Sequence, residues 1–299
     1  MNFDLGPDET ALRDAIRELC AREFPVRRAF DREGWKQLAD AGVFSLRLAD
    51  GAGLGMTEAV IVFEELGRAM VCGPLVASHI AAGVIDGAAT GDRVVTILAG
   101  DIATYPDDSD VVLILGVEHA YVVERFEATP RNGLDPLTPI GELRADVSGV
   151  RIDADPKTLQ GLGAALTAAL SSGIASRTVE LAVDYAKQRV QFNKPIGSFQ
   201  AVKHLCADMF VRAEVARAAV DAAGVGLDEH DPDVASAVTA AKLIASEAAV
   251  ANAKSCVQIF GGMGFTWEVD AHLYLKRAAL LATQFGGVDE QAELAAARL

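Results

Sequence analysis

The chain has 299 residues and a formal net charge of −15, so it can bury a substantial core in one large or two modest domains. This acidity argues against a general binder of nucleic acid or of anionic membranes. Hydrophobic residues make up 51% and aromatic residues only 6%, a composition that favours closely packed helices over a β-sandwich.

Residues 1–90 predict an N-terminal helical domain. An acidic start at Asp8 precedes apolar residues at helical spacing, which predicts a first helix, and a second is expected at 33–41. After the glycine-rich segment 50–55, Thr57 is expected to cap a third helix. That segment lacks the preceding strand and the lysine of a phosphate-binding loop, so we interpret it as a turn.

Several features bear on the location of the protein. Charged residues begin at position four, so no signal peptide is expected, and no apolar run approaches the length of a membrane span. The four cysteines are widely separated, and we interpret them as buried free thiols of a reducing compartment. No CxxC, HExxH or His–Cys cluster predicts a metal site. We therefore expect a cytoplasmic protein without a membrane anchor.

Residues 91–156 change character and predict a small, reduced central β-domain. Short β-branched runs are separated by clusters of Asp, Pro and Gly, which predicts strands and turns. We interpret residues 105–110, YPDDSD, as a solvated loop. The runs are RVVTILAG, DVVLILG, HAYVVERF and GVRI.

Residues 157–299 are helical in pattern nearly to the end. Long helices joined by short turns predict a four-helix-type bundle, so the chain as a whole is mostly α with a small β insert. The breaks come from Pro195, Gly197, a polar stretch at 228–233 and two glycines at 261–262. The expected helices are 158–190, 198–227, 233–262, 270–283 and 288–298.

Two stretches of this bundle hold the candidate site residues. In the first, QRVQFNKPIGSFQ (188–200), Arg189 ends one helix and Gln200 lies in the first turn of the next. A cation at a helix C-terminus is favourable in any protein, and Phe192 and Phe199 could be core residues. In the second, QIFGGMGFTWEVDAHLYLKRA (258–278), the glycines suit an ordinary helix end. Each stretch alone is therefore a weak signal.

Together the two stretches resemble the C-terminal domain of the acyl-CoA dehydrogenase family of flavoproteins. The family pattern has an arginine, a Phe-Gly, a Pro-Ile, a Phe-Gln and a later Gln-x-x-Gly-Gly-x-Gly-Phe. Asn193 departs from the glycine of the Phe-Gly, a mild change because asparagine tolerates turn geometry. The N-terminal stretches GWKQLADAGVFSLRL and GAGLGMTEAVIVFEELGRAM resemble its first helical domain. The resemblance covers about residues 1–90 and 158–284. It implies FAD as cofactor, with the adenosine diphosphate half resting on the C-terminal domain of a neighbouring subunit.

The resemblance also assigns roles to individual residues. It implies that Arg189 neutralises the FAD pyrophosphate, which suits the fixed fork of donors of a guanidinium. Phe192 matches an aromatic residue beside the adenosine portion, and Phe199 and Gln200 match a helix start near the cofactor. The second stretch matches the segment that lines the same half of FAD, through Gln258, Gly261 and Gly262.

The family's catalytic base has no visible counterpart. The reaction removes a proton next to a thioester, which requires a carboxylate within reach. Phe285 or Gly286 stands where many members carry a glutamate, and Ala164 stands near the position that others use. Glu268 and Asp270 are substitutes to weigh, although a role at a helix start explains an acid at Glu268 better. The flavin-ring segment is also not recognisable between 92 and 155. We assign no catalytic residue.

Retained adenosine-side residues without a base suggest the non-catalytic half of a hetero-oligomer. The wording GFTWEVDAHLYLKRA resembles the α2β2 acyl-CoA dehydrogenases of steroid-degrading actinobacteria. The resemblance implies a homologous catalytic subunit as partner, a steroid-derived acyl-CoA as substrate and an electron-transferring flavoprotein as acceptor. Two alternatives stay open: a self-sufficient homo-oligomer with a displaced base, and a flavin-free structural or regulatory paralogue.

Overall fold

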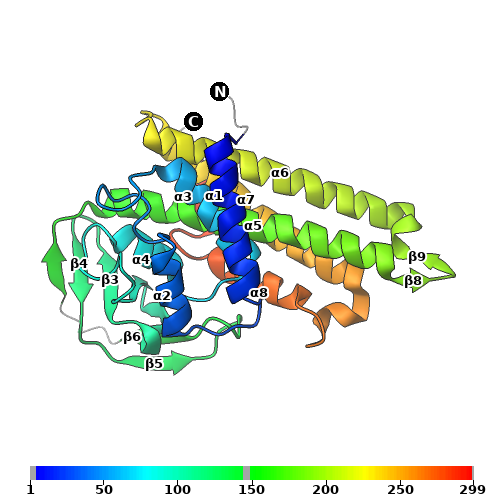
Figure 1. Cartoon of the computed structure of the whole chain (residues 1–299), viewed down its shortest axis with the longest axis horizontal. Helices are drawn as coiled ribbons and strands as arrows, with labels where there is room; N and C mark the ends of the chain where they lie inside the picture. Colours follow the sequence, from blue (N-terminus) through cyan, green and yellow to red (C-terminus); the bar gives the residue numbers. More distant parts are fainter. Residues whose placement is uncertain (1–4, 144–148, 298–299) are drawn as a thin grey trace.

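The computed structural model describes residues 5–143 and 149–297. Figure 1 shows long helices side by side along the longest axis, with a β-sheet against one end of them. The helices are α1 (Pro7–Glu23), α2 (Arg32–Asp40), α3 (Met56–Arg68), α4 (Leu75–Ala81), α5 (Pro156–Gln188), α6 (Gln200–Asp228), α7 (Val234–Phe260), α8 (Ala271–Leu281) and α9 (Val288–Ala296). The strands are β1 (Val95–Ala99), β2 (Ile102–Thr104), β3 (Val111–Leu115), β4 (Ala120–Val123), β5 (Ala128–Arg131), β6 (Ile140–Leu143), β7 (Val150–Ile152), β8 (Val190–Gln191) and β9 (Lys194–Pro195).

The prediction that Thr57 caps α3 is wrong. Thr57 lies inside the helix, and the N-cap is Gly55. The first two amides of α3 instead donate to the Asp228 carboxylate at the end of α6, from Met56 at 2.6 Å and from Thr57 at 2.8 Å. A Cβ on Gly55 would lie 2.5 Å from that carboxylate, so a larger residue here would displace the cap. A residue far along the chain thus supplies the cap.

The central region holds one seven-stranded sheet, in the order β5-β6-β2-β1-β3-β4-β7. Neighbouring strands pair antiparallel except β1 and β3, which are parallel. The four expected runs form β1, β3, β4 and β7, while β2, β5 and β6 are additional. The sheet is therefore larger than the β-branched runs alone suggest.

The prediction that residues 105–110 form a solvated loop is wrong for the first two of these residues. Tyr105 and Pro106 are buried, and residues 106–108 form a 3₁₀ turn. The Tyr105 hydroxyl donates to the Leu137 carbonyl at 2.9 Å. This buried aromatic anchors the segment from within the sheet, and only its acidic side chains reach solvent.

The five helices α5 to α9 begin and end within two residues of the predicted bounds, although the expected final residue, 298, lies outside the described residues. α5 lies at the centre, and α3 packs on it so closely that the backbones meet. A Cβ on Gly67 would lie 2.1 Å from the Leu170 carbonyl oxygen, and one on Gly173 would lie 2.0 Å from that of Glu64. The two glycines permit this contact because they carry no side chain.

α7 is long and apolar enough to cross a membrane by length and composition. One face of it is instead buried in the bundle. Ala241, Ala245, Ala249 and Ala253 are all fully buried, and they share that face at spacings of four residues. The apolar character of α7 thus supplies part of the core of the bundle.

A buried ion pair joins the bundle to the sheet. Arg277 of α8 donates from its Nε to Asp135, which lies between β5 and β6. Its Nη1 also donates to the Val71 carbonyl at 3.2 Å. Asp135 accepts further bonds from the Leu137 amide at 3.0 Å and the Thr138 hydroxyl at 2.7 Å. Because both charges are hydrogen-bonded, their burial is compensated.

Candidate functional site

The first candidate stretch folds into a small hairpin at the end of α5, which projects from the far tip of the bundle (Figure 1). β8 pairs antiparallel with β9. The two residues between them, Phe192 and Asn193, have φ angles of 53° and 64°. Two consecutive left-handed residues are the usual geometry of a two-residue hairpin turn. Asparagine suits it, whereas phenylalanine adopts it at a cost.

The side chains of this hairpin face outward. The Phe192 ring is 86% exposed and meets the Phe199 ring edge-on, with centroids 6.1 Å apart. The Lys194 ammonium lies 4.4 Å from the Phe199 centroid, which is a cation–π distance. Arg189 caps the C-terminus of α5 with its backbone, while its side chain is exposed and forms no ion pair with any described residue. Gln200 is the first residue of α6 and is also exposed.

The second candidate stretch forms an open surface at the end of α7. Gln258 is exposed in the last turn, and Gly261 follows the helix with a φ of 62°. A Cβ built on Gly261 or on Gly262 would meet no atom within 4 Å. The backbone there is accessible to a large group, since no neighbouring atom covers it.

An aromatic pair brings the two stretches to the same end of the bundle. Tyr185, in the last turn of α5, stacks on Phe260, the last residue of α7, with ring centroids 4.0 Å apart. The Tyr185 hydroxyl also donates to the Phe260 carbonyl at 3.5 Å. Sequence reasoning missed this pair and Lys194, although an aromatic residue at each helix end was a visible signal.

The exposed groups at this tip fit part of FAD. Arg189 offers an unpaired guanidinium to an anion, Phe192 offers an uncovered ring face, and Gly261–Gly262 leave backbone open to close approach. In the described ranges, no group of three His, Cys, Asp or Glu side chains is arranged to hold a metal ion. The exposed groups at this tip suit an anion with an attached flat ring.

The two positions where the family carries its catalytic base, at Phe285–Gly286 and near Ala164, lie away from the tip. Phe285 follows α8 with a φ of 52°, and its side chain is 6% exposed. A Cβ on Gly163 of α5 would lie 2.1 Å from the Phe285 ring, so the ring lies directly on the helix beside Ala164. The Gln291 amide Nε2 donates to the Phe285 carbonyl at 3.4 Å and fixes the turn. A phenyl ring therefore fills the space over α5 at Gly163, the residue next to Ala164 in the sequence.

A small apolar cavity of about 40 Å³ lies next to that ring. Side chains from α3, α5 and α8 line it, among them Leu66, Leu170 and Leu281. All lining residues are among those the structure describes, and none of them is a carboxylate. The cavity has about the volume of one water molecule, too small for an acyl chain.

Comparison with known proteins relates both regions to one family. A family model described as "Acyl-CoA dehydrogenase, C-terminal domain" matches residues 158–299, and one described as "Acyl-CoA dehydrogenase, N-terminal domain" matches residues 6–92. The chain is 36% identical over 280 residues to the acyl-CoA dehydrogenase IpdE2 of Mycobacterium tuberculosis, covering 88% of this chain and 84% of that protein. It is also 36% identical over 286 residues to FadE34 of the same organism. That match covers 84% of this chain but only 40% of FadE34.

Solved structures share the fold at lower identity. The ChsE4–ChsE5 complex from Mycobacterium tuberculosis matches with a TM-score of 0.83 and 23% identity, covering all of this chain and 98% of that one. Butyryl-CoA dehydrogenase from Megasphaera elsdenii matches with a TM-score of 0.85 and 19% identity, covering all of this chain and 99% of that one. A protein described as the Tcur3481–Tcur3483 steroid ACAD matches with a TM-score of 0.84 and 21% identity, covering 98% of each chain.

Proposed function

Because the chain belongs to the acyl-CoA dehydrogenase family, FAD-dependent oxidoreductases that act on CH–CH groups, we propose that it is the non-catalytic subunit of a hetero-oligomer. In this proposal the chain completes the FAD site of a homologous catalytic partner and supplies no base. FAD, when bound, supplies the hydride acceptor. The single observation that carries the proposal is the contrast between the open tip at Arg189 and the filled space at Phe285.

The tip supports a role in completing a partner's site. Arg189 would neutralise the pyrophosphate, since its guanidinium has no ion-pair partner within the described residues. Phe192 and Phe199 would pack beside the adenosine portion, and Gln200 would lie near the cofactor at the start of α6. Gln258, Gly261 and Gly262 would line the same half of the cofactor. These roles are binding and orientation only.

Exposed apolar side chains on two segments of the bundle support a partner chain. α6 presents Phe210, Val211 and Val215 to solvent, and the connection between α7 and α8 presents Phe265 and Trp267. Neighbouring exposed apolar groups mark an interaction site more often than isolated ones. Aromatic residues in particular are enriched at such interfaces. We propose that a homologous catalytic subunit covers these side chains in an α2β2 assembly in the cytoplasm.

The filled space at Phe285 supports the absence of an active site in this chain. The self-sufficient alternative would need a base close to that ring. Glu268 precedes α8 and Phe285 follows it, and this helix of 11 residues is about 16 Å long. Glu268 is therefore on the wrong side of α8 to replace the missing carboxylate.

The substrate class and the electron acceptor are the most specific parts of the proposal. Relatives support the substrate class, and the family resemblance supports the acceptor. One structural neighbour is described as a steroid ACAD, and another is a complex of two different chains. We propose a steroid-derived CoA thioester as substrate, bound by the partner, and an electron-transferring flavoprotein as acceptor. The flavin-free alternative does not explain why Arg189 has no ion-pair partner among the described residues or why the backbone at Gly261–Gly262 is uncovered.

Flavin content tests this proposal. The chain is purified alone and together with homologous acyl-CoA dehydrogenase chains encoded beside it, and FAD per complex is measured by absorbance. We expect little FAD and no acyl-CoA oxidation from the chain alone, and FAD with turnover from the pair. FAD and turnover in the purified homo-oligomer would overturn the proposal, and an active pair that keeps its FAD when Arg189 and Phe192 are both replaced would support the flavin-free alternative.

A further inference from the structure

A second cavity, of about 330 Å³, lies where α1, α3, α5 and α6 meet. It is separate from the tip and from the Phe285 turn. Three carboxylates line it, those of Glu64, Glu65 and Asp221, among four arginine side chains. Whether each carboxylate has its own guanidinium decides what this cavity can do.

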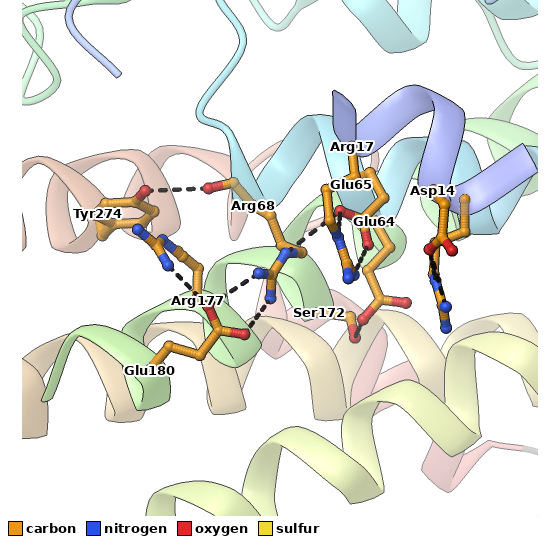
Figure 2. Close-up of polar contacts among 10 residues, drawn as sticks. Asp14, Arg17, Glu64, Glu65, Arg68, Ser172, Arg177, Glu180 and Tyr274 are labelled. Carbon is orange, nitrogen blue, oxygen red and sulfur yellow. Dashed lines mark hydrogen bonds and ion pairs between the residues drawn. The ribbon is translucent and has the colours of Figure 1, made fainter. Parts of the chain in front are cut away.

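Arg17 and Arg68, two of these arginines, form ion pairs with carboxylates other than Glu64 and Asp221, as Figure 2 shows. Arg17 forms a two-pronged pair with Glu65, at 2.9 Å and 2.6 Å. Arg68 forms another with Glu180 of α5, at 2.8 Å and 2.9 Å, and Arg177 binds the same carboxylate at 2.8 Å. This chain of alternating charges neutralises one wall of the cavity.

The opposite wall is not neutralised in the same way. Arg217 of α6 donates to Glu214 at 2.7 Å and forms a longer ion pair with Asp221, at 3.7 Å. Glu64 receives one hydrogen bond from the described part of the chain, from the Ser172 hydroxyl at 3.3 Å. Figure 2 shows Glu64 beside Ser172, with no dashed line to an arginine. Both carboxylates line this cavity. Among the described residues, no guanidinium forms an ion pair with Glu64, and Asp221 shares Arg217 with Glu214.

We propose that Glu64 of α3 and Asp221 of α6, which line the same cavity, form a proton-binding site in the folded chain. Two carboxylates that share a poorly solvated site cannot both ionise without a large electrostatic cost. Binding a proton removes that cost and lets the remaining charge be balanced by Arg217.

The electrostatics of each group agree with this geometry. Burial raises the pKa of Glu64 to about 7, and the charges of Asp221 and Glu65 add to the effect. Burial likewise raises the pKa of Asp221 to about 6. Arg217 opposes this rise, whereas Glu214 and, from α1, Glu9 reinforce it.

The direction of the pH dependence follows. Both carboxyl groups have a higher pKa in the folded chain than their ordinary values of 4.5 and 3.8. Their contribution to stability is therefore full at pH values below about 4 and is lost as the pH rises through about 6 and 7. Buried His79, whose pKa burial lowers to about 4, acts in the opposite sense on the whole chain. The test must therefore compare variants.

Urea unfolding of the full chain between pH 5.5 and 8, at fixed ionic strength, tests the proposal. The wild type is compared with Glu64→Gln/Asp221→Asn and with Asp208→Asn, a control that removes an exposed charge from the same helix α6. Each proton released on unfolding raises the unfolding equilibrium constant by up to about tenfold per pH unit. We expect the double variant to lose this dependence and to unfold at least about tenfold less readily than wild type at pH 8. The Asp208→Asn control should keep the wild-type slope.

Parallel pH profiles for wild type and the double variant would overturn the proposal. If the double variant does not fold, wild-type protein labelled with ¹³C at the glutamate carboxyl carbons decides the question. A glutamate signal that titrates near pH 7 supports the site. A native protein in which every glutamate titrates below about pH 5, as an unperturbed side chain does, rejects it.

Discussion

Phe192 and Phe285 adopt the same left-handed backbone, with φ angles of 53° and 52°, in opposite environments. Phe192 is 86% exposed at the hairpin tip, and Phe285 is 6% exposed against α5. Non-glycine residues occupy this region at a cost that the surroundings must offset. The core of its own chain holds Phe285, whereas the Phe192 ring meets the edge of the Phe199 ring and is otherwise largely open to solvent. One turn is therefore closed by packing, and the other is open.

The largest expected effect is at the closed turn. Phe285→Ala removes a ring from a packed core, which should lower the free energy of unfolding by about 3–5 kcal/mol. Phe265→Ala is the control, because this ring is exposed between α7 and α8, and it should change the stability of the isolated chain little. Both are measured by urea unfolding. A loss below about 1 kcal/mol for Phe285→Ala would show that the ring does not seal this junction.

Arg189→Ala tests the open tip. Losing a charge-assisted hydrogen bond to an anion should cost about 1.5–3 kcal/mol of FAD binding, roughly tenfold to a hundredfold in affinity. The variant should still assemble with its partner but lose flavin on gel filtration, and Arg189→Lys should restore it incompletely. Arg22→Ala, at an exposed arginine of α1, is the control. An Arg189→Ala complex that retains its full flavin would make Arg189 an ordinary helix terminus.

Gly286→Glu places a carboxylate at the expected base position, and we expect no acyl-CoA oxidation from it. Gly286 has a φ of 97°, and a Cβ there would lie 2.2 Å from Gln291 Nε2. The substitution should destabilise the chain by about 1–3 kcal/mol. Gly287→Glu is the matched control, because a Cβ at Gly287 meets no atom within 4 Å. Turnover by the Gly286→Glu homo-oligomer would show that a base alone was missing.

The smallest expected effect on the fold is at Phe192. Phe192→Ala should change the stability of the isolated chain by at most about 0.5 kcal/mol, because its ring makes few contacts there. In the complex it should nevertheless increase flavin loss on dilution, as absorbance would record. Val117→Ala, at another highly exposed apolar residue, should alter neither property. Equal flavin retention in both variants would remove Phe192 from the cofactor site.

The sequence predicted the helices well because their apolar periodicity and their breaks are local signals. It missed β2, β5 and β6, whose sequences IAT, ATPR and IGEL lack a β-branched run. Pairing with neighbouring strands, rather than propensity, makes these segments strands. Tyr105 was expected in solvent because its acidic neighbours are polar, and no local pattern shows that the sheet covers it.

In the candidate site, too, the residues with a local sequence signal were predicted and the contacts between distant residues were not. The resemblance located Arg189, Gln258 and the glycines, and the structure gathers their stretches at one end of the bundle through Tyr185 and Phe260. Their roles toward FAD stay predictions. The contact of Phe285 with Gly163 joins residues 122 positions apart, so no local pattern could reveal that one position of the missing base fills the space beside the other.

The cap that Asp228 places on α3 sets an order of events during synthesis. Thr57 and Asp228 are 171 residues apart, so at 5–20 residues per second the ribosome delivers the cap about 9–34 s after the helix start. Until then, water alone can satisfy the first two amides of α3. The N-terminal layer therefore reaches its final hydrogen bonding only when most of the chain exists, and its folding is coupled to completion of α6.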